Sequence, residues 1–400
     1  MPQMNRNVCA TRRALTGTHL MQLEISPELA ELRTALRRFT TEKLEPIALE
    51  IDRTGEVPQQ AFDALRTQGY LGLRLPSELG GSGMDLSAFC LAQEEFSRSH
   101  RMFSLILEGS TGFLPIAITR FGTDEQIKKY VPALATGKMV SAFALTEPGA
   151  GSDSQAITTR AERREGGWLL NGRKHYISGA HKADVTLVMA VNDAQKRARG
   201  GISSFLVDRG TPGFLVTRVD TTMGSDAIKL AELTFEDCFV PDGAVLGEVG
   251  QGFKIAMDSL ISGRMGVSCC CIGVADRLVE MSAQHAKSRN TFGKPLADRQ
   301  AIQWMLADSA TDLALARALV YETLRRVVAG EDVGSAPSMC KLYCSEMVGR
   351  IADRAVQIHG GMGIVKGYPV ERFYRDVRHY RIGEGSSEVQ RMLIAREVLR

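Results

Sequence analysis

Glu384 is a single carboxylate with a glycine on each side, in the run Gly383-Glu384-Gly385-Ser386-Ser387-Glu388 that precedes a predicted helix. So little side-chain bulk lets the backbone approach a ligand closely, and the start of the following helix adds positive partial charge. A carboxylate placed in this way is suited to take a proton from a bound molecule. Taken alone, however, the pattern is more typical of a glutamate on the surface.

Two further motifs lie where the sequence predicts strands. In Phe143-Ala144-Leu145-Thr146-Glu147-Pro148-Gly149-Ala150-Gly151-Ser152-Asp153, a strand ends in a loop of small residues whose N–H groups and hydroxyls can bind a ring edge or a phosphate. This loop lacks the Gly-Lys-Ser/Thr ending of a P-loop, and taken alone it is more typical of a plain glycine-rich turn between strands. Tyr176 and Ser178 share one face of a predicted strand and can contact a flat heteroaromatic ring, although core packing of Tyr176 is the favoured interpretation of this motif alone.

Two more motifs lie at the ends of predicted helices. The first of these motifs is the run Arg289-Asn290-Thr291-Phe292-Gly293, which is followed by Gln300. The planar guanidinium of Arg289 is suited to bind a pyrophosphate. A solvated arginine at a helix end is the alternative. The helix that ends in Gln357-Ile358-His359-Gly360-Gly361 has glycines that either cap the helix or admit a nucleotide or another chain. His359 has no second ligand at suitable spacing, so no metal site is expected.

The elements that position these motifs change character twice along the chain. Residues 25–137 show helical periodicity, starting at the N-cap Ser26 with Pro27 next to it, and the apolar positions recur between Leu86 and Ser97. Short alternating runs over residues 140–250 predict an antiparallel β-barrel or sandwich, with a polar hairpin tip at 192–201. Long helices are expected at 260–288, 301–330, 338–359 and 387–399, with Ser387-x-x-Gln390 as a capping box. The predicted domains are 21–139, 140–250 and 251–400, after an N-terminus at 1–20 that is disordered or incorrectly started.

Composition limits the class of protein. The 400 residues are enough for two or three cores, and a net charge of +3 without a basic block argues against a nucleic-acid surface. No apolar run approaches the roughly 18–20 residues of a membrane helix. The eight cysteines include Cys269-Cys270-Cys271 but no C-x-x-C pair, so they are expected to be small apolar helix residues in a reducing compartment. The first twenty residues carry arginines and no acid, which also resembles a transit peptide.

Together and in this order, the five motifs resemble the acyl-CoA dehydrogenase superfamily over residues 22–400. The resemblance implies an α+β multidomain fold: an N-terminal helical domain, a central antiparallel β domain and a C-terminal four-helix bundle. It also implies FAD, a homotetramer built as a dimer of dimers, an electron-transfer flavoprotein as electron acceptor, and a role in fatty acid or amino acid catabolism. The expected location is the bacterial cytoplasm, or the mitochondrial matrix in a eukaryote.

The resemblance also implies roles for individual residues. Flavin contacts are expected from Phe143, Leu145, Thr146, Gly151, Ser152, Tyr176 and Ser178. The pyrophosphate and adenosine would be held across a subunit interface by Arg289, Phe292, Gln300, Gln357, Gly360 and Gly361, and the last cofactor contacts are expected from Ser386 and Glu388. Ser152, Arg264 and Arg396 match positions that contact CoA, and Glu108 matches the bottom of the acyl pocket in medium-chain members.

The activity implied is removal of the α-proton of an acyl-CoA by Glu384 while flavin N5 accepts hydride from the β-carbon, giving a trans-2-enoyl-CoA. Isovaleryl- and long-chain-type members carry their base at the position of Gly263, where this chain has no carboxylate. Gly383 replaces a bulkier residue, which predicts extra room for a branched, cyclic or otherwise bulky acyl group. Ile261 replaces Asp or Asn at one CoA contact, and Tyr176 replaces the more common Trp.

Two alternatives stay open at this point. One is an oxidase of the same fold that passes electrons to oxygen. The other is a non-catalytic nucleic-acid-binding relative, for which the low net charge gives little support. Acyl chain length, pathway and physiological electron acceptor are not specified by the residues.

Overall fold

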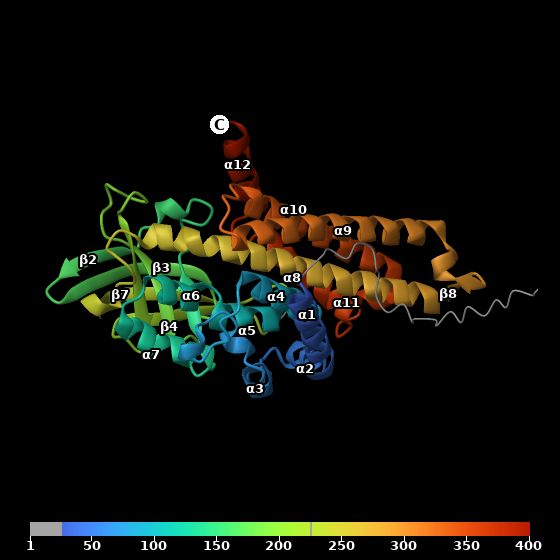
Figure 1. Ribbon diagram of the computed structural model, residues 1–400, viewed down its shortest axis with the longest axis horizontal. Coiled ribbons are helices and arrows are strands. Elements are labelled where there is room, and N and C mark those ends of the chain that lie inside the picture. Colours follow the sequence, from blue (N-terminus) through green and yellow to red (C-terminus); the bar gives the residue numbers. More distant parts are fainter. Residues whose placement is uncertain (1–25, 225) are drawn as a thin grey trace, which may run out of the picture.

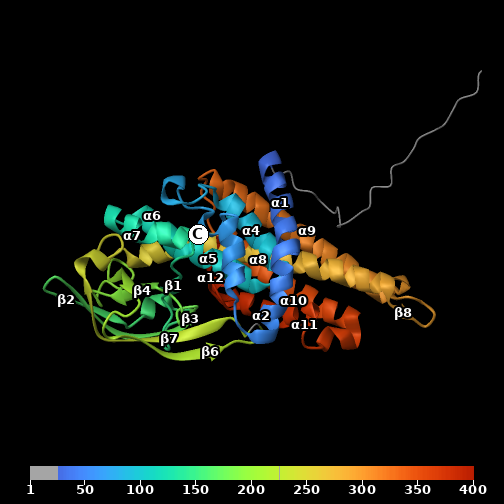
Figure 2. The same ribbon diagram turned by 90° about the horizontal axis from the view of Figure 1, so that it is seen from below.

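The computed structural model describes residues 26–224 and 226–400, so the expectation for residues 1–20 lies outside the described chain. Helices, a β-sheet and a second set of helices follow one another along the sequence (Figure 1). The sheet lies at one end of the molecule and the β8–β9 hairpin at the other in both views (Figure 2). The expected order of a helical, a β and a second helical domain is therefore confirmed.

The N-terminal domain is helical, as predicted. Ser26 caps its first helix by accepting a hydrogen bond from the Leu29 N–H at 3.3 Å, with Pro27 in the first turn. One predicted helix, Leu86–Ser97, has the predicted bounds, because Asp85 caps it and its apolar residues are buried. The helices of this domain are α1 (Pro27–Phe39), α2 (Glu45–Thr54), α3 (Gln59–Thr67), α4 (Leu86–Ser97), α5 (Arg101–Thr111), α6 (Phe113–Phe121) and α7 (Asp124–Ala135), with a π-helical turn at Thr40–Leu44.

The central domain is one curled sheet, in agreement with the expected central β domain; four of its strand pairs are antiparallel, as expected, and two are parallel. Its strand order is β1-β4-β2-β3-β7-β6, with β5 on β4. The pairs β1–β4 and β2–β4 are parallel because the chain forms the β2–β3 hairpin before it returns to β4 beside β1. The strands are β1 (Ser141–Ala144), β2 (Arg160–Arg164), β3 (Gly167–Ser178), β4 (Val185–Val191), β5 (Ile202–Asp208), β6 (Phe214–Thr221) and β7 (Lys229–Pro241).

The C-terminal domain begins with three long helices that pack on one another: α8 (Gly252–Ser288), α9 (Gln300–Val328) and α10 (Ala336–His359). The hairpin of β8 (Asn290–Thr291) and β9 (Lys294–Pro295) joins α8 to α9, and α11 (Pro369–Asp376) follows α10. The last helix, α12 (Ser387–Val398), contacts α10 near its start and then projects from the body (Figure 1). Its cap is Ser386, which accepts from the Val389 N–H, so the predicted capping role of Ser387 is wrong.

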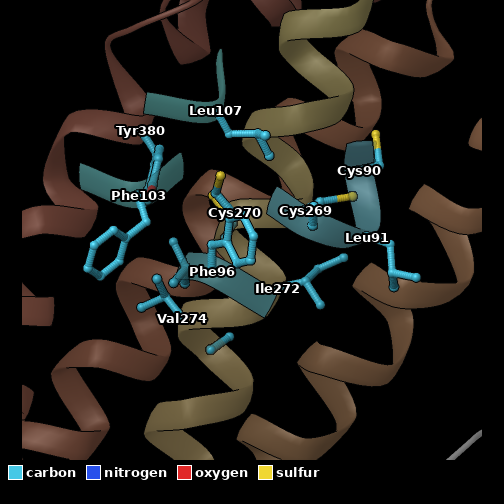
Figure 3. Close-up of a cluster of buried hydrophobic side chains, with 14 of the residues drawn as sticks. Cys90, Leu91, Phe96, Phe103, Leu107, Cys269, Cys270, Ile272, Val274 and Tyr380 are labelled. Atoms are coloured by element: carbon cyan, nitrogen blue, oxygen red, sulfur yellow. The ribbon is translucent and has the colours of Figure 1, made fainter. Parts of the chain in front are cut away.

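The main core lies between the N-terminal helices and the bundle. Figure 3 shows Phe96 and Phe103 packed around Cys269 and Cys270 of α8. The seven described cysteines are buried and free, and burial raises the pKa of the Cys270 thiol to about 12, which makes it unreactive. The expectation of small apolar residues holds for the helical cysteines, whereas Cys238 lies on β7.

Charged side chains also join the two helical domains. The buried Glu94 of α4 accepts from Arg317 Nη2 at 3.0 Å and from the Tyr321 hydroxyl at 2.7 Å, both on α9. Arg98, which directly follows α4, pairs with Asp276 of α8. Such pairs keep buried charges satisfied, so they fix how α4 lies against the bundle that positions the candidate site.

Two helical stretches, Arg101–Phe121 and Gly252–Ser288, have the length and apolar composition of a membrane span. This corrects the statement that no apolar run approaches that length. More than half of each stretch, 61% and 56% of the apolar window, is buried inside the fold. Burial against other protein segments is the property expected of core helices, and it accounts for their composition.

Candidate active site

Glu384 lies in a turn between the short helical segment Val377–Arg381 and α12. Glu384 and Gly385 both have left-handed backbone conformations, with φ of 59° and 87°. A non-glycine residue rarely adopts this conformation, and it persists only where neighbours hold it in place. Gln390 Nε2 donates to the carbonyl oxygens of Glu384 and Gly385 at 3.1 and 2.9 Å, and Lys341 Nζ donates to that of Gly385 at 2.6 Å.

The side chain of Glu384 points at a gap in α8. A Cβ on Gly263 would stand 2.9 Å from Oε2 of Glu384 and 2.5 Å from Cζ of Phe113. Among the described residues this Oε2 is buried and has no hydrogen-bond partner. Burial raises the pKa of Glu384 to about 7, and the positive charges of Arg264 and Lys341 oppose the rise. The result is a carboxyl group that titrates near neutral pH.

A second carboxyl group, that of Glu108 on α5, lies near the first. Gln93 Nε2 donates to its Oε2 at 3.1 Å, while Oε1 is buried without a partner among the described residues. Burial raises the pKa of Glu108 to about 7, and the negative charge of Glu384 adds to the rise. Gly266, one helical turn after Gly263, faces Glu108, because its Cβ would stand 3.7 Å from Oε2. Gly263 therefore makes room for the carboxyl group of Glu384, whereas Gly266 on the same face of α8 lies at ordinary contact distance from that of Glu108.

Aromatic rings connect the carboxyl groups to the sheet. Phe113 of α6 stacks on Phe143 of β1, with ring centroids 5.6 Å apart. Ser141 of β1 donates its hydroxyl to the Gly109 carbonyl at 2.6 Å, one residue after Glu108. The predicted flavin residue Phe143 is thus brought close to the predicted base by way of Phe113, a residue that the sequence did not single out.

A buried ion pair fixes the glycine-rich loop. Glu147 accepts from Lys174 Nζ at 2.8 Å and from the N–H groups of Thr158 and Thr159 at 2.6 and 2.9 Å. Lys174 also donates to the Leu145 carbonyl at 3.0 Å. Against the opposing effect of burial, the Lys174 ammonium and these hydrogen bonds lower the pKa of Glu147 to about 2. These contacts fix the start of the loop on its buried side. Gly151 and Ser152, farther along the loop, are exposed.

The side chains of Tyr176 and Ser178 are exposed on β3, as their spacing predicted. A register shift between Lys174 and Ile177 gives Tyr176 a φ of 58° and turns its ring outward. Tyr176 is 57% exposed and stacks on His175. Core packing of Tyr176, the interpretation that the motif alone favours, is therefore wrong, and the ring is available to contact a ligand.

The remaining predicted cofactor residues lie at the other end of the molecule. At 1.5 Å per residue, α8 rises roughly 36 Å between Arg264, which lies beside Glu384, and Ser288, next to Arg289. The ends of α8 and α10 meet there, since the rings of His285 and His359 stack with centroids 4.4 Å apart. This group is exposed and comprises Arg289, Phe292, Gln300, Gln357, Gly360 and Gly361. One chain does not bring both groups of predicted residues together.

The space that Gly383 leaves is filled by His379. A Cβ on Gly383 would stand 2.8 Å from Nε2 of His379. The expectation that this glycine widens an acyl pocket is therefore wrong in its reasoning, because the missing side chain makes room for an imidazole of the same chain. Burial, together with the charges of Arg101 and Lys341, lowers the pKa of His379 well below its ordinary value, so its ring is neutral.

The predicted CoA contacts differ in their surroundings. Arg264 is directed inward: its Nη1 donates to the Ser338 hydroxyl at 3.4 Å, and Nε is buried without a partner among the described residues. Arg396, Ile261 and Glu388 are exposed, and Ser386 is occupied as the cap of α12. Within residues 26–224 and 226–400, no group of three or more His, Cys, Asp or Glu side chains is placed to hold a metal ion.

The sequence did not identify some residues around the site as functional. They are Lys341, Phe113, His379 and the Glu147–Lys174 pair. Lys341 and Lys174 carried one local signal, a charged residue at a position that the helical or strand periodicity assigns to the interior. Phe113 and His379 carried none, because an aromatic residue next to apolar neighbours is ordinary.

Comparison with known proteins identifies the family of the chain. Family models for the N-terminal, middle and C-terminal domains of acyl-CoA dehydrogenase match residues 26–138, 142–238 and 250–399. An acryloyl-CoA reductase (NADH) of Anaerotignum propionicum is 40% identical over 382 residues, which cover 95% of this chain and 96% of that protein. Subunit CarC of the caffeyl-CoA reductase–Etf complex of Acetobacterium woodii is 40% identical over 92% of this chain and 95% of its own.

Solved structures are similar throughout their length. Butyryl-CoA dehydrogenase from Megasphaera elsdenii superposes with a TM-score of 0.90 at 33% identity, covering 95% of this chain and 100% of that one. PigA with FAD and proline has a TM-score of 0.90 at 28% identity, covering 94% and 99%. Matches that span nearly the whole chain at these identities establish common descent, and the protein described here belongs to the acyl-CoA dehydrogenase family of oxidoreductases.

Proposed function

We propose that the protein catalyses the FAD-dependent α,β-dehydrogenation of an acyl-CoA thioester to a trans-2-enoyl-CoA, with Glu384 as the base. The observation that carries this proposal is the carboxyl group of Glu384, whose Oε2 is buried without a partner among the described residues and whose pKa is raised to about 7. A base is most effective when its pKa lies near the working pH. The carboxylate is also held at a fixed place, because Gln390 and Lys341 bind the carbonyl groups of its turn.

The surroundings of Glu384 suit an apolar acyl group next to a polar thioester. Phe113 and the glycine face of α8 border the carboxylate, and Glu108 lies farther along the same face. Exclusion of water strengthens electrostatic interactions within such a site. Glu384 would remove the α-proton, and Glu108 would border the distal end of the acyl chain. Ser152 and Arg396, which are exposed, would contact CoA.

The residues fit a flavin nucleotide. Tyr176 and Phe292, which are 57% and 97% exposed, offer aromatic faces, and Thr146, Gly151 and Ser152 offer polar groups on a loop that the Glu147–Lys174 pair fixes. Leu145, Phe143 and Ser178 complete the set at the sheet, and Ser386 and Glu388 lie at the start of α12. When bound, FAD would supply a hydride acceptor for the β-carbon. The similarity to chains solved with FAD supports this assignment.

A shared cofactor site accounts for the two separated groups of residues. Arg289, Phe292, Gln300, Gln357, Gly360 and Gly361 lie at the far end of α8 and would bind the pyrophosphate and adenosine of a flavin whose ring sits in a neighbouring copy. This arrangement requires an oligomer, and we propose the homotetramer that is typical of the family. An electron-transfer flavoprotein is the proposed redox partner, supported by the Etf complex to which the similar CarC subunit belongs.

Reduction of a 2-enoyl-CoA is the second candidate. It is favoured by the pKa of Glu384, since a group that titrates at about 7 is present in both protonated and ionised forms near neutral pH. The protonated form can return a proton to the α-carbon, as microscopic reversibility requires. The similar proteins named acryloyl-CoA and caffeyl-CoA reductase support this direction.

Anaerobic titration of the flavin-loaded protein with a panel of straight, branched and aromatic acyl-CoAs tests the proposal. Bleaching of the flavin by at least one saturated acyl-CoA, and its loss in Glu384→Gln, is expected. Absence of bleaching with every saturated acyl-CoA, combined with re-oxidation of the chemically reduced protein by 2-enoyl-CoAs, would leave reduction as the function. Rapid oxygen consumption with substrate alone would instead indicate an oxidase.

A further inference from the structure

Lys341 is a buried lysine in the middle of the helical bundle. It lies in α10 and has none of its surface exposed. Removing an ammonium group from water is unfavourable unless partners in the protein compensate. Nζ donates to the Gly385 carbonyl at 2.6 Å, and Gly385 directly follows the proposed base. This contact spans 44 residues of sequence and joins the bundle to the turn that carries Glu384.

We propose that Lys341 is a positioning residue for the base: its ammonium group fixes the Glu384–Gly385 turn through the Gly385 carbonyl and supplies a positive charge that favours the ionised form of Glu384. The proposal rests on the proposed function of Glu384 and extends it to a residue on a different helix. It assigns Lys341 two effects, one geometric and one electrostatic, and each has its own observations.

The geometric effect follows from how the turn is held. Glu384 and Gly385 are consecutive left-handed residues, which the chain does not adopt without support. On α10, Glu346 accepts from the Ser387 hydroxyl at 2.8 Å and pairs with Arg381 Nε at 3.1 Å. Together with the Lys341 bond to Gly385, these contacts anchor the segment on both sides of Glu384. Loss of Lys341 leaves Gln390 to hold the two carbonyl groups.

The electrostatic effect follows from the groups that face Glu384. Arg264 of α8 and Lys341 of α10 favour its ionised form, whereas Glu108 of α5 disfavours it. His379, from the segment before the turn, is neutral because its pKa is lowered well below the ordinary value. Burial lowers the pKa of Lys341 itself to about 8, so it still carries its charge at neutral pH. The Cys271 thiol beside it stays protonated, since burial raises its pKa well above the ordinary value.

Three variants test these effects together: Lys341→Met removes the donor and the charge, Lys341→Arg keeps both, and Lys128→Met removes one exposed charge on α7 as the matched control. The readout is the pH profile of kcat/KM, which reports the ionisation of the free enzyme. In Lys341→Met the acid limb is expected to move up by about one pH unit. This shift corresponds to a roughly fivefold loss of kcat/KM at pH 7 relative to its value at pH 9. Lys341→Arg should restore the limb, and Lys128→Met should leave it unchanged.

A second readout does not depend on turnover. The pH titration of the protonated carboxyl stretch in infrared difference spectra, assigned to Glu384 by its loss in Glu384→Gln, should show the same upward movement in Lys341→Met. If no acyl-CoA is a substrate, this titration still decides the role of Lys341 separately from the proposed function. If Lys341→Met does not fold, Lys341→Gln replaces it, because an amide is tolerated better than a methyl group beside a carbonyl.

An unchanged midpoint in both readouts would overturn the proposal, even if overall activity fell, because a merely structural lysine lowers activity at every pH equally. A midpoint that moves in Lys128→Met as far as in Lys341→Met would overturn it as well, since net charge would then be the cause. A shift confined to the Lys341→Met or Lys341→Gln variant and reversed in Lys341→Arg would support it.

Discussion

The carboxylate of Glu384 occupies the space that a side chain on Gly263 would need. A Cβ at Gly263 would stand 2.9 Å from Oε2 of Glu384, although the two residues come from different elements. The family resemblance also implies that isovaleryl- and long-chain-type members carry their base at the position of Gly263. Side chains at positions 263 and 384 would therefore compete for the same space. A chain with its base at one of these positions needs a small residue at the other. This relation accounts for the presence of a glycine in the middle of a long helix, where it lowers stability.

Gly263→Ala is expected to lower activity more than it lowers stability. The new methyl group would meet Cζ of Phe113 at 2.5 Å and the Glu384 carboxylate at 2.9 Å, so the carboxylate or the ring must move. A displacement of this kind is expected to reduce kcat/KM by roughly 10–100-fold, or about 1.4–2.7 kcal/mol. The matched control is Gly266→Ala on the same face, whose methyl group would stand 3.1 Å from Phe89 and 3.7 Å from Glu108. Equal losses in the two variants would contradict the idea that Gly263 makes room for the base.

Glu384→Gln is expected to lower kcat by about 10²–10⁴-fold, which is the typical contribution of a general base. The same variant should be at least as stable as the wild type at pH 8. The folded-state pKa of about 7 lies above the ordinary value of 4.5, so the folded chain holds a proton that the unfolded chain releases between these pH values. The wild type therefore loses stability as the pH rises from 4.5 to 7, and the Glu384→Gln variant does not.

Thermal midpoints of the wild type and Glu384→Gln at pH 4.5, 6 and 8 measure this effect. The thermal midpoint of Glu384→Gln minus that of the wild type should increase up to about pH 7 and then stay constant. Equal midpoints at all three pH values would mean that Glu384 is not strained by its burial, and its role as a base with a raised pKa would have to be abandoned.

Glu108→Gln is expected to move the acid limb of kcat/KM to lower pH. The negative charges of Glu108 and Glu384 repel each other, so removing one lowers the pKa of the other. The pH profile measures this directly. Glu78→Gln, which removes an exposed carboxylate from the same domain, is the control and should leave the limb in place. A shift to higher pH in Glu108→Gln would show that Glu108 acts on Glu384 in some way other than charge.

Local features of the fold were predictable from the sequence, and contacts between distant segments were not. The bounds of α4 and β4 follow from a cap, periodicity and an apolar run that lie within the element itself. β2 carries no local strand signal, because Arg160-Ala161-Glu162-Arg163-Arg164 is charged and its strand conformation depends on pairing with β3. The parallel pairing of β1 with β4 likewise depends on the path of the chain between them.

The same distinction holds for the site. Glu384 was identified from the residues beside it and from its family motif, and Gly263 from its alignment with a second base position. The approach of Glu108 to Glu384 and the bond from Lys341 to Gly385 join segments far apart in sequence and have no local signature. Gly383 shows how a local argument fails: a missing side chain implied a wider pocket, but tertiary packing placed His379 there.

Lys174→Met is expected to destabilise the protein and to weaken flavin binding. The variant would leave the carboxylate of Glu147, only 5% exposed, without its counter-ion, and breaking a buried pair on one side commonly costs about 3–5 kcal/mol. It would also release the Leu145 carbonyl and so loosen the loop that ends in Gly151 and Ser152. Thermal unfolding and the flavin-to-protein absorbance ratio measure the two effects.

The double variant Lys174→Met/Glu147→Gln separates a charge effect from a packing effect. The amide that Glu147→Gln introduces is neutral and keeps one carbonyl oxygen for the N–H groups of Thr158 and Thr159, so the double variant should regain part of the stability that the single variant loses. Flavin content should recover with it, because both depend on the same loop. A double variant no more stable than Lys174→Met would mean that the lysine acts through packing and its bond to Leu145, and that the ion pair contributes little to holding the loop.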